Sequence, residues 1–296
     1  MHSFDEYKDI VNKHLFDYLA DTYSFSDVLR ESMAYSLKVG GKRIRPVLLL
    51  AACEYAGGNI KDAVPFACSL EYIHTYSLIH DDLPAMDNDD YRRGEPTNHK
   101  VYGEDMAVLA GDGLLSTAAE VMTAEILNNS DNHEKMLNCA KAAHTILERA
   151  GSNGMIAGQV ADVRNQYDEA TPALVKFIEE HKTADLIVAP VLAGLALAGA
   201  DDNLTSKFET FALNLGVAFQ VSDDILDFEG DAETLGKGVG KDKDLGKCNY
   251  ACVHGVDEAK AELHRLTAEA KNALADLGDD AKFFTDLADT LEIRKA

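Results

Sequence analysis

The chain has 296 residues, of which 46% are hydrophobic and 27% are charged, an ordinary composition for a globular protein. Its formal net charge of -23 argues against nucleic acid or an anionic membrane surface as the main partner. Residues 1–20 lack a secretory pattern, and the five cysteines are scattered. The longest apolar run, around 186–200, is too short for a bilayer. We therefore expect a cytoplasmic protein without integral membrane association.

Helical periodicity runs through almost the whole chain. The expected helices cover about 7–19, 26–40, 46–57, 63–82, 105–128, 133–150, 172–199, 203–229, 256–276 and 280–294. The alternation typical of strands is missing, so no strand is expected. Three of these helices, at 63–82, 172–199 and 203–229, are apolar on most sides and should be buried. With no linker or internal repeat, the sequence predicts one all-α domain over 1–296.

Two loops rich in glycine and lysine, 39–46 and 235–242, interrupt this helical pattern. Neither has the GxxxxGK[ST] spacing of a Walker loop. Glycine lets a backbone approach a phosphate closely, and lysine and arginine donate hydrogen bonds to it. Taken alone, such loops are more often plain connectors, so they are only candidates for phosphate binding.

Aspartates crowd into two short stretches, HDDLPAMDNDDYRRG at 80–94 and FQVSDDILD at 219–227. In the second, Asp223, Asp224 and Asp227 fall on one side of a helix end among apolar residues. Burying these carboxylates without a counter-ion would cost several kcal/mol each. Mg²⁺ accepts carboxylate and phosphate oxygens and would remove that cost. One such cluster could be a solvated helix end, but two clusters beside paired arginines favour a metal and phosphate site.

The chain resembles the trans-prenyltransferases, the isoprenyl diphosphate synthases, and most of all their bacterial farnesyl diphosphate synthases. Besides the two aspartate-rich motifs, the matching segments are GGKRIRP (40–46), EYIHTYSLIHDD (71–82), AGDGLL (110–115), GQVAD (158–162), HKT (181–183) and LGK (235–237), in that order. The resemblance covers nearly the whole chain. It implies an all-α homodimer, in which each chain is an antiparallel helical bundle around a central cavity and forms a single polyprenyl synthase domain.

The resemblance also implies the residues of the site. Three Mg²⁺ ions, which Mn²⁺ could replace, would bind with the diphosphate at Asp81, Asp82, Asp87, Asp223, Asp224 and Asp227. Among these, Asp81, Asp87 and Asp223 would be the direct ligands. The allylic diphosphate would be contacted by Arg92, Lys182 and Lys237. The second substrate, isopentenyl diphosphate, would bind to Lys42, Arg45, His74 and Arg93.

The expected reaction requires this kind of site. An allylic C–O bond ionises when the charge on the departing diphosphate is neutralised. The isopentenyl double bond then attacks the allylic cation, and the released diphosphate takes up the proton lost in the 1'-4 condensation. No side-chain nucleophile is needed. The Thr183 hydroxyl, the Gln220 amide and a carbonyl near Pro190 would stabilise the cation by their dipoles; with Lys182 and Arg92, Thr183 and Gln220 are the expected catalytic residues.

Product length is expected to be set just before the first motif. Ser77 and Tyr76 lie four and five residues before Asp81, which places them about 6–7.5 Å further down the helix. The resembling bacterial farnesyl diphosphate synthases carry Tyr at the position of Tyr76, where its ring closes the pocket at C15. The sequence therefore favours farnesyl diphosphate as the product.

Three segments depart from the family pattern. Ala184 and Asp185 replace a typical Gly-Ala, Cys248 and Asn249 stand in KCNY in place of K-x-T-Y, and Tyr91 replaces a leucine. An acid near Lys182, such as Asp185, could pair with it and weaken its contact to phosphate.

Alternative functions remain open at this point. The nearest is a geranylgeranyl diphosphate synthase, which performs the same chemistry. A class I terpene cyclase is disfavoured by GGKRIRP, by Arg93 and by DDILD. A non-catalytic prenyl synthase subunit is disfavoured because both aspartate motifs are intact.

Overall fold

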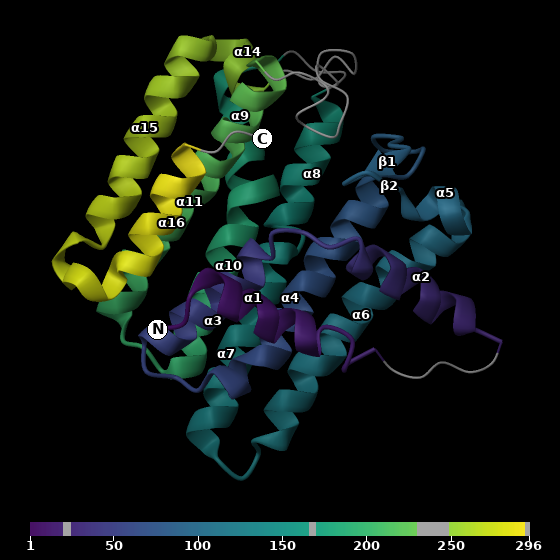
Figure 1. Ribbon diagram of the computed structural model, residues 1–296, viewed down its shortest axis with the longest axis horizontal. Coiled ribbons are helices and arrows are strands. Elements are labelled where there is room, and N and C mark those ends of the chain that lie inside the picture. The colour runs from purple at the N-terminus through teal and green to yellow at the C-terminus, as the bar shows by residue number, and fades with distance from the viewer. Residues whose placement is uncertain (20–24, 166–169, 230–248, 294–296) are drawn as a thin grey trace. The chain divides into compact units, whose positions relative to one another are not determined.

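The computed structural model describes residues 1–19, 25–165, 170–229 and 249–293, and these are mainly helical (Figure 1). The all-α expectation is confirmed. The chain groups into two compact units, Met1–His144 with Ala193–Gly199, and Thr145–Leu192 with Ala200–Ala296. The assignment of 1–296 to one domain remains a prediction.

The first unit consists of packed helices. They are α1 (Phe4–His14), α2 (Asp27–Lys38), α3 (Ile44–Tyr55), α4 (Ile60–Asp81), α5 (Asn98–Tyr102), α6 (Glu104–Asn128) and most of α7 (His133–Ala150). The central helix, α4, packs against both α3 and α6. It is buried along most of its length, and Phe66 and Leu70 on it are fully buried together with Leu48 on α3. This packing fixes the end of α4, where the first aspartate motif begins.

The beginnings of two helices in this unit follow from local capping. At α1, the Glu6 N–H donates to Ser3 Oγ at 3.3 Å and the Ser3 N–H donates to Glu6 Oε2 at 2.7 Å, which completes a capping box. At α4, the Asn59 side chain accepts from the Lys61 N–H at 3.1 Å. Because of this cap, α4 begins at Ile60, earlier than the periodicity indicated.

The expectation that the chain has no strands is wrong at one place. A short antiparallel hairpin is formed by β1 (Tyr91–Arg92) and β2 (Glu95–Pro96), with Tyr91 opposite Pro96. Arg93 and Gly94 in the turn have φ of 54° and 82°. Two successive positive φ values are typical of the tight type I′ hairpin turn. Strands of two residues are too short to show alternation, so periodicity could not reveal them.

The second unit is built around α11. Its elements are α8 (Met155–Arg164), α9 (Pro172–Ile178), a π-helical segment (Glu179–Ala184), most of α10 (Asp185–Ala198), α11 (Asp202–Glu229), α14 (Tyr250–His254), α15 (Val256–Ala273), a 3₁₀ segment (Ala275–Ala281) and α16 (Lys282–Glu292). Helices α15 and α16 lie along α11 (Figure 1). Phe208 and Phe211 of α11 pack edge to face on Phe284 of α16, with ring centroids 4.8 and 5.7 Å away.

The helix expected at 172–199 has the expected extent but is not uniform. A π-helical segment separates α9 from α10, and α10 continues through Pro190. Contrary to the sequence expectation, the stretch Pro172–Ala198 is long and apolar enough to cross a membrane. Buried core helices share that property, and 67% of its apolar window is buried inside the structure. The lack of integral membrane association remains a prediction.

Candidate active site

The first aspartate motif begins where α4 ends. Asp81 is the last residue of the helix and is partly exposed, whereas Asp82 is its C-cap and is only 3% exposed. The Asp87 N–H donates to the Asp81 carbonyl at 2.9 Å, and the Asp89 N–H donates to the Asp82 carbonyl at 3.2 Å. The loop therefore folds back on the helix end and brings the backbone of Asp87 beside Asp81.

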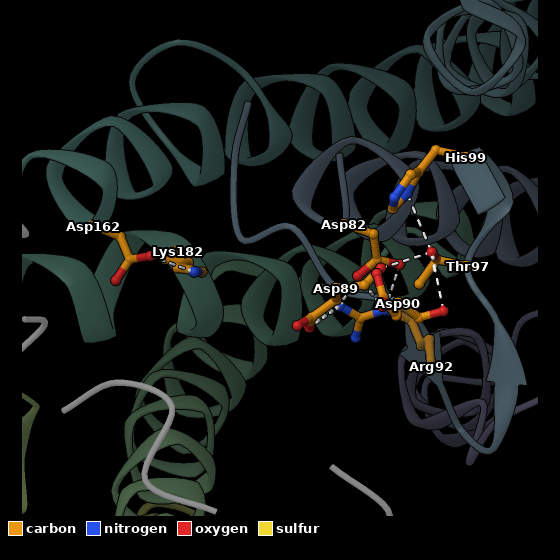
Figure 2. A network of polar contacts seen from close by, with 8 residues as sticks. All are labelled: Asp82, Asp89, Asp90, Arg92, Thr97, His99, Asp162 and Lys182. Atoms are coloured by element: carbon orange, nitrogen blue, oxygen red, sulfur yellow. Dashed lines mark hydrogen bonds and ion pairs between the residues drawn. The ribbon is translucent and has the colours of Figure 1, made fainter. Parts of the chain in front are cut away.

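Asp82 is bound to Arg92 within this motif (Figure 2). The Arg92 Nε donates to both carboxylate oxygens of Asp82, at 2.8 and 2.9 Å. Asp89 also lies near this guanidinium, with Oδ2 4.0 Å from Arg92 Nη2. Burial raises the pKa of the Asp82 carboxyl even though Arg92 opposes the shift. The position of the Arg92 guanidinium, expected to contact the allylic diphosphate, is thus set by the motif that precedes it.

Thr97, directly after β2, ties the hairpin to the acidic loop (Figure 2). Its hydroxyl donates to the Asp89 carbonyl at 2.7 Å, and its backbone N–H donates to the Asp90 carbonyl at 3.0 Å. The Nδ1 atom of His99 lies 3.1 Å from the same hydroxyl oxygen. Since a hydroxyl has one proton, His99 Nδ1 carries the hydrogen and donates it. These bonds fix the acidic loop against the hairpin that carries Arg92.

Residues expected to bind isopentenyl diphosphate lie together in the first unit. Arg45 Nη1 is 3.4 Å from His74 Nε2, and the Arg93 guanidinium donates to the Gly40 carbonyl. Burial, and then the charge of Arg45, holds the pKa of His74 well below its usual range, so His74 is neutral. Burial is the main reason that the pKa of Arg45 is lowered to about 10; the charge of Glu71 opposes this shift, and the charge of Arg93 adds to it. A bound anion would relieve the repulsion between the charges of Arg45 and Arg93. Lys42 is exposed on the same loop as Arg45.

Arg43 is a residue of this loop that sequence reasoning missed. It has a left-handed backbone, with φ of 56°, and is 6% exposed. Its guanidinium forms a buried ion pair with Glu71 at 2.5 Å and donates to the Leu37 carbonyl at 2.7 Å and to Asn12 Oδ1 at 3.2 Å. With three hydrogen-bonding partners, the buried Arg43 side chain holds the loop in place. The GGKRIRP segment contained Arg43, but nothing in its pattern separates an anchor from a ligand-binding arginine.

In the second unit, Lys182 forms an ion pair with Asp162 (Figure 2). Lys182 Nζ lies 2.7 Å from Asp162 Oδ2, and Asp162 is 8% exposed. The two residues meet because α8 packs directly on the π-helical segment. A Cβ atom at Gly158 would lie 2.1 Å from the Lys182 backbone nitrogen, so only glycine permits this approach. Asp162 therefore holds the amine of Lys182, which sequence analysis expects to bind diphosphate.

The concern that Asp185 would pair with Lys182 is wrong. Asp185 is 2% exposed, and its Oδ1 accepts from Arg149 Nη1 at 2.7 Å. Its Oδ2 lies 2.8 Å from His181 Nδ1, and Arg149 Nη2 also donates to Glu209 at 2.8 Å. The carboxylate instead ties the end of the π-helical segment to α7 and, through Arg149, to α11.

A chain of hydrogen bonds joins the expected cation-stabilising residues to the second aspartate motif. Thr183 Oγ1 donates to Gln220 Oε1 at 2.6 Å, and Gln220 Nε2 donates to Asp224 Oδ1 at 2.8 Å. The Tyr250 N–H, at the start of α14, donates to Asp224 Oδ2 at 2.9 Å. Asp224 is 4% exposed, whereas Asp223 is partly exposed. The structure thus separates aspartates that spacing alone treats alike.

Glu179 is the first residue of the π-helical segment, and the sequence analysis assigned it no role. It is 3% exposed, and its Oε1 has no hydrogen-bond partner within the described part of the chain. Burial, and then the charges of Asp224 and Glu262, raise the pKa of Glu179 to about 9. Glu179 is therefore a neutral acid at pH 7. A glutamate directly before Glu180 is typical of ordinary surface charge, so its burial could not be predicted from the sequence.

Some sequence expectations fall outside the described residues. Lys237, the loop 235–242 and Cys248 cannot be placed for that reason. Asn249 is described, and its side chain caps α14 by accepting from the Cys252 N–H at 3.1 Å. Tyr91 lies in β1 and is 61% exposed.

The aspartates fit a metal that binds together with a phosphate. Within the ranges that the structure describes, no group of three or more His, Cys, Asp or Glu side chains is arranged to hold a metal by itself. Mg²⁺ usually takes one or two carboxylates and completes its shell with water and substrate phosphate. The partly exposed Asp81, Asp87, Asp223 and Asp227 suit that use.

Comparison with known proteins shows the family of the chain. The polyprenyl synthetase family model matches residues 26–284. The chain belongs to the polyprenyl synthetase family. It is 46% identical over 246 residues to the geranylgeranyl diphosphate synthase of Cyanophora paradoxa, covering 82% of this chain and 80% of that protein. It is 42% identical over 268 residues to the farnesyl diphosphate synthase of Bacillus subtilis, covering 90% and 89%.

Solved structures of the polyprenyl synthetase family share the fold. A Zymomonas mobilis FPP/GFPP synthase superimposes with a TM-score of 0.85 at 26% identity, covering 98% of this chain and 97% of that one. A Helicobacter pylori geranyltransferase, complexed with magnesium and isoprenyl diphosphate, gives 0.83 at 31% identity, covering 97% and 94%. The chain is thus a prenyltransferase of this family, acting on isoprenyl diphosphates. Its relatives include both farnesyl and geranylgeranyl synthases, so their names alone do not assign the product.

The contact between α8 and the π-helical segment predicts the effect of Gly158→Ala in this prenyltransferase. The added methyl would meet the Lys182 backbone, which cannot yield as a side chain could. We expect a loss of about 1–3 kcal/mol in unfolding free energy from overpacking, and lower turnover as Lys182 and Thr183 shift. Urea unfolding and a prenyl transfer assay would measure both effects.

The matched control is Gly113→Ala on α6. There the nearest atom to an added Cβ is the Met33 Sδ at 2.9 Å, the end of a flexible side chain that can move aside. This variant should stay close to wild type in stability and rate. Equal behaviour of the two variants would contradict the role assigned to Gly158.

Proposed function

We propose that this family member is a Mg²⁺-dependent farnesyl diphosphate synthase. It condenses isopentenyl diphosphate with dimethylallyl and geranyl diphosphate and so supplies isoprenoid biosynthesis. The observation that supports farnesyl diphosphate as the product is the position of Tyr76. Its ring is buried on α4, shortly before Asp81, and would stop a growing prenyl chain there.

The proposed mechanism assigns one task to each group of residues. Arg92 and Lys182 bind the allylic diphosphate, and their pairing with Asp82 and Asp162 holds both cations ready for it. Arg45, Arg93 and Lys42 bind the second diphosphate. Neutral His74, which accepts from Arg45, orients that guanidinium. The released diphosphate removes the proton that the condensation frees.

The metal site is part of the proposal. Asp81, Asp87 and Asp223 would hold Mg²⁺, with Asp227 also accessible on its helix. Bound Mg²⁺ would neutralise the charge that develops on the departing diphosphate. Asp82 and Asp224 are buried and bound to protein groups, so they would hold Arg92 and Gln220 in position and would not bind the metal directly.

The product assignment rests on Tyr76. This side chain is 6% exposed, and its ring packs edge to face on His80 with centroids 5.7 Å apart. His80 in turn contacts the Val108 carbonyl of α6 at 3.1 Å. The ring is therefore supported from α6 and cannot swing away easily. Ser77 is smaller, and its hydroxyl donates to the His74 carbonyl at 2.9 Å, so it leaves Tyr76 as the obstacle.

Product analysis tests this assignment. Wild-type protein supplied with Mg²⁺, isopentenyl diphosphate and dimethylallyl diphosphate should accumulate the C15 product. Tyr76→Ala should shift the product to C20 or longer, because removing a buried ring opens space along α4. Tyr76→Phe keeps the ring and should still give C15. A C20 product from the wild type would favour the alternative, a geranylgeranyl diphosphate synthase. The similarity to the geranylgeranyl diphosphate synthase of Cyanophora paradoxa supports that alternative.

A homodimer is also proposed. In its favour, α5 and α6 expose Val101, Val108 and Leu109, at 47%, 40% and 48%. Exposed apolar residues on neighbouring helices are common at subunit interfaces. Sedimentation equilibrium would distinguish one chain from two. The cytoplasmic location remains a prediction from the sequence.

A further inference from the structure

Asp224 differs from the other aspartates of the second motif. It is 4% exposed, while Asp223 and Asp227 on the same helix end are partly exposed. Both of its oxygens accept a hydrogen bond from the protein, from Gln220 Nε2 at 2.8 Å and from the Tyr250 N–H at 2.9 Å. Its carboxylate is thus directed into the second unit, towards its own helix and the start of α14.

The carboxylate decides which way the Gln220 amide points. An ionised carboxylate only accepts hydrogen bonds, so the NH₂ end of the amide must face Asp224. The carbonyl end then faces Thr183, and the Thr183 hydroxyl donates to Gln220 Oε1 at 2.6 Å. Without a fixed acceptor at Asp224, the amide could turn over, because a hydroxyl can serve either end of it.

This order of donors also determines the charge on the Thr183 oxygen. Its only proton is used in the bond to Gln220, so its lone pairs are free to face a positive charge. The bonds run in one direction, with Thr183 donating to Gln220 and Gln220 donating to Asp224. Hydrogen bonds in such a chain polarise one another and increase the negative charge on Thr183 Oγ1. An oxygen of this kind stabilises a nearby cation.

We propose that Asp224 is a positioning residue for prenyl transfer: it fixes the Gln220 amide, and through it the Thr183 hydroxyl, so that their oxygens face the allylic cation. The inference rests on the proposed function, and it gives Asp224 a task other than metal binding. Its effect belongs to the step in which the cation forms, not to the binding of metal and diphosphate.

The first test compares Asp224→Asn with Asp223→Asn, which removes the same charge one residue away. In Asp224→Asn, a single carbonyl must serve both Gln220 and Tyr250, so the Gln220 amide is no longer fixed. We expect kcat to fall about 10- to 100-fold from misorientation, with KM for the allylic substrate unchanged. Calorimetric binding of inorganic pyrophosphate with Mg²⁺ should match wild type. Asp223→Asn, which removes an expected ligand, should weaken that binding at least about 10-fold.

A double-mutant cycle shows whether Asp224 acts through Gln220. Gln220→Leu should lower kcat by itself while leaving binding of magnesium pyrophosphate intact. Adding Asp224→Asn to Gln220→Leu should then cost far less than Asp224→Asn costs in the wild type, because the amide to be oriented is gone. Circular dichroism and thermal unfolding accompany every variant.

Several outcomes would overturn the inference. They are weaker binding of magnesium pyrophosphate by Asp224→Asn, full additivity in the cycle, and normal kcat in Asp224→Asn. Should Asp224→Asn fail to fold, Gln220→Leu decides alone, and a normal kcat there rejects the inference. A wild-type protein that forms no prenyl product would instead reject the proposed function, so the two failures are separable.

Discussion

Replacing Asp81 by alanine is expected to lower turnover by roughly three orders of magnitude and to leave helix content nearly unchanged. Asp81 ends α4 and is partly exposed, and the Asp87 backbone is bonded to its carbonyl. The substitution leaves that backbone bond intact and removes one carboxylate of the proposed metal site. Steady-state kinetics at saturating Mg²⁺ would measure the loss, and circular dichroism would confirm the fold.

Asp90→Ala is the matched control for this prediction. It removes a carboxylate from the same stretch, but Asp90 pairs with Lys100 at 2.7 Å on the exposed surface. Surface pairs contribute little to stability, so the variant should fold and keep most of its turnover. If both variants lost activity equally, the effect would come from the overall charge of the stretch, and the metal role of Asp81 would be rejected.

Glu179→Gln should stabilise the protein, and increasingly so as the pH rises. Burial raises the pKa of Glu179 to about 9, far above the ordinary value of 4.5 for a glutamate. The folded state therefore binds a proton that the unfolded state releases between these values. Stability from the neutral acid is complete below pH 4.5 and is lost as the pH rises towards 9. Glutamine keeps the neutral shape without this loss, which should amount to a few kcal/mol at pH 8–9.

Urea unfolding in metal-free buffer at pH 6, 7, 8 and 9 would test this prediction. The difference between Glu179→Gln and wild type should grow across the series. Glu180→Gln is the control, since Glu180 is the next residue and only half-buried, with Lys176 3.7 Å away. Its effect should be small and nearly independent of pH. A pH-independent difference for Glu179→Gln would contradict the buried, neutral state of Glu179.

The sequence predicted the long helices well because their apolar period extends over many turns. It placed the end of α4 and both ends of α11 to within one residue, and with them Asp81 and Asp223. It missed β1 and β2, where two positive-φ residues make a turn that needs no strand pattern. It also missed the π-helical segment, because one extra residue in a turn cannot be recognised in a short polar run such as Glu179–Ala184.

The sequence predicted a set of candidate site residues, but it could not predict how each of them is held. Motif resemblance grouped Arg45, His74 and Arg93, and the structure places Arg45 beside His74. Spacing could not show that Asp82 and Asp224 are buried, because burial depends on segments far away in the chain, such as Tyr250. For the same reason, the partner of Asp185 was predicted wrongly.

The π-helical segment takes up one extra residue between α9 and α10. An α-helix turns by about 100° per residue, so an extra residue in a regular α-helix would rotate everything after it by that angle. The wider turn at Glu179–Ala184 absorbs this rotation. Leu186, Val188 and Val191, which are each no more than 1% exposed, therefore keep their places in the core. Relatives of this chain that lack one of these six residues should accordingly keep the packing of α10 and form a regular α-helix there.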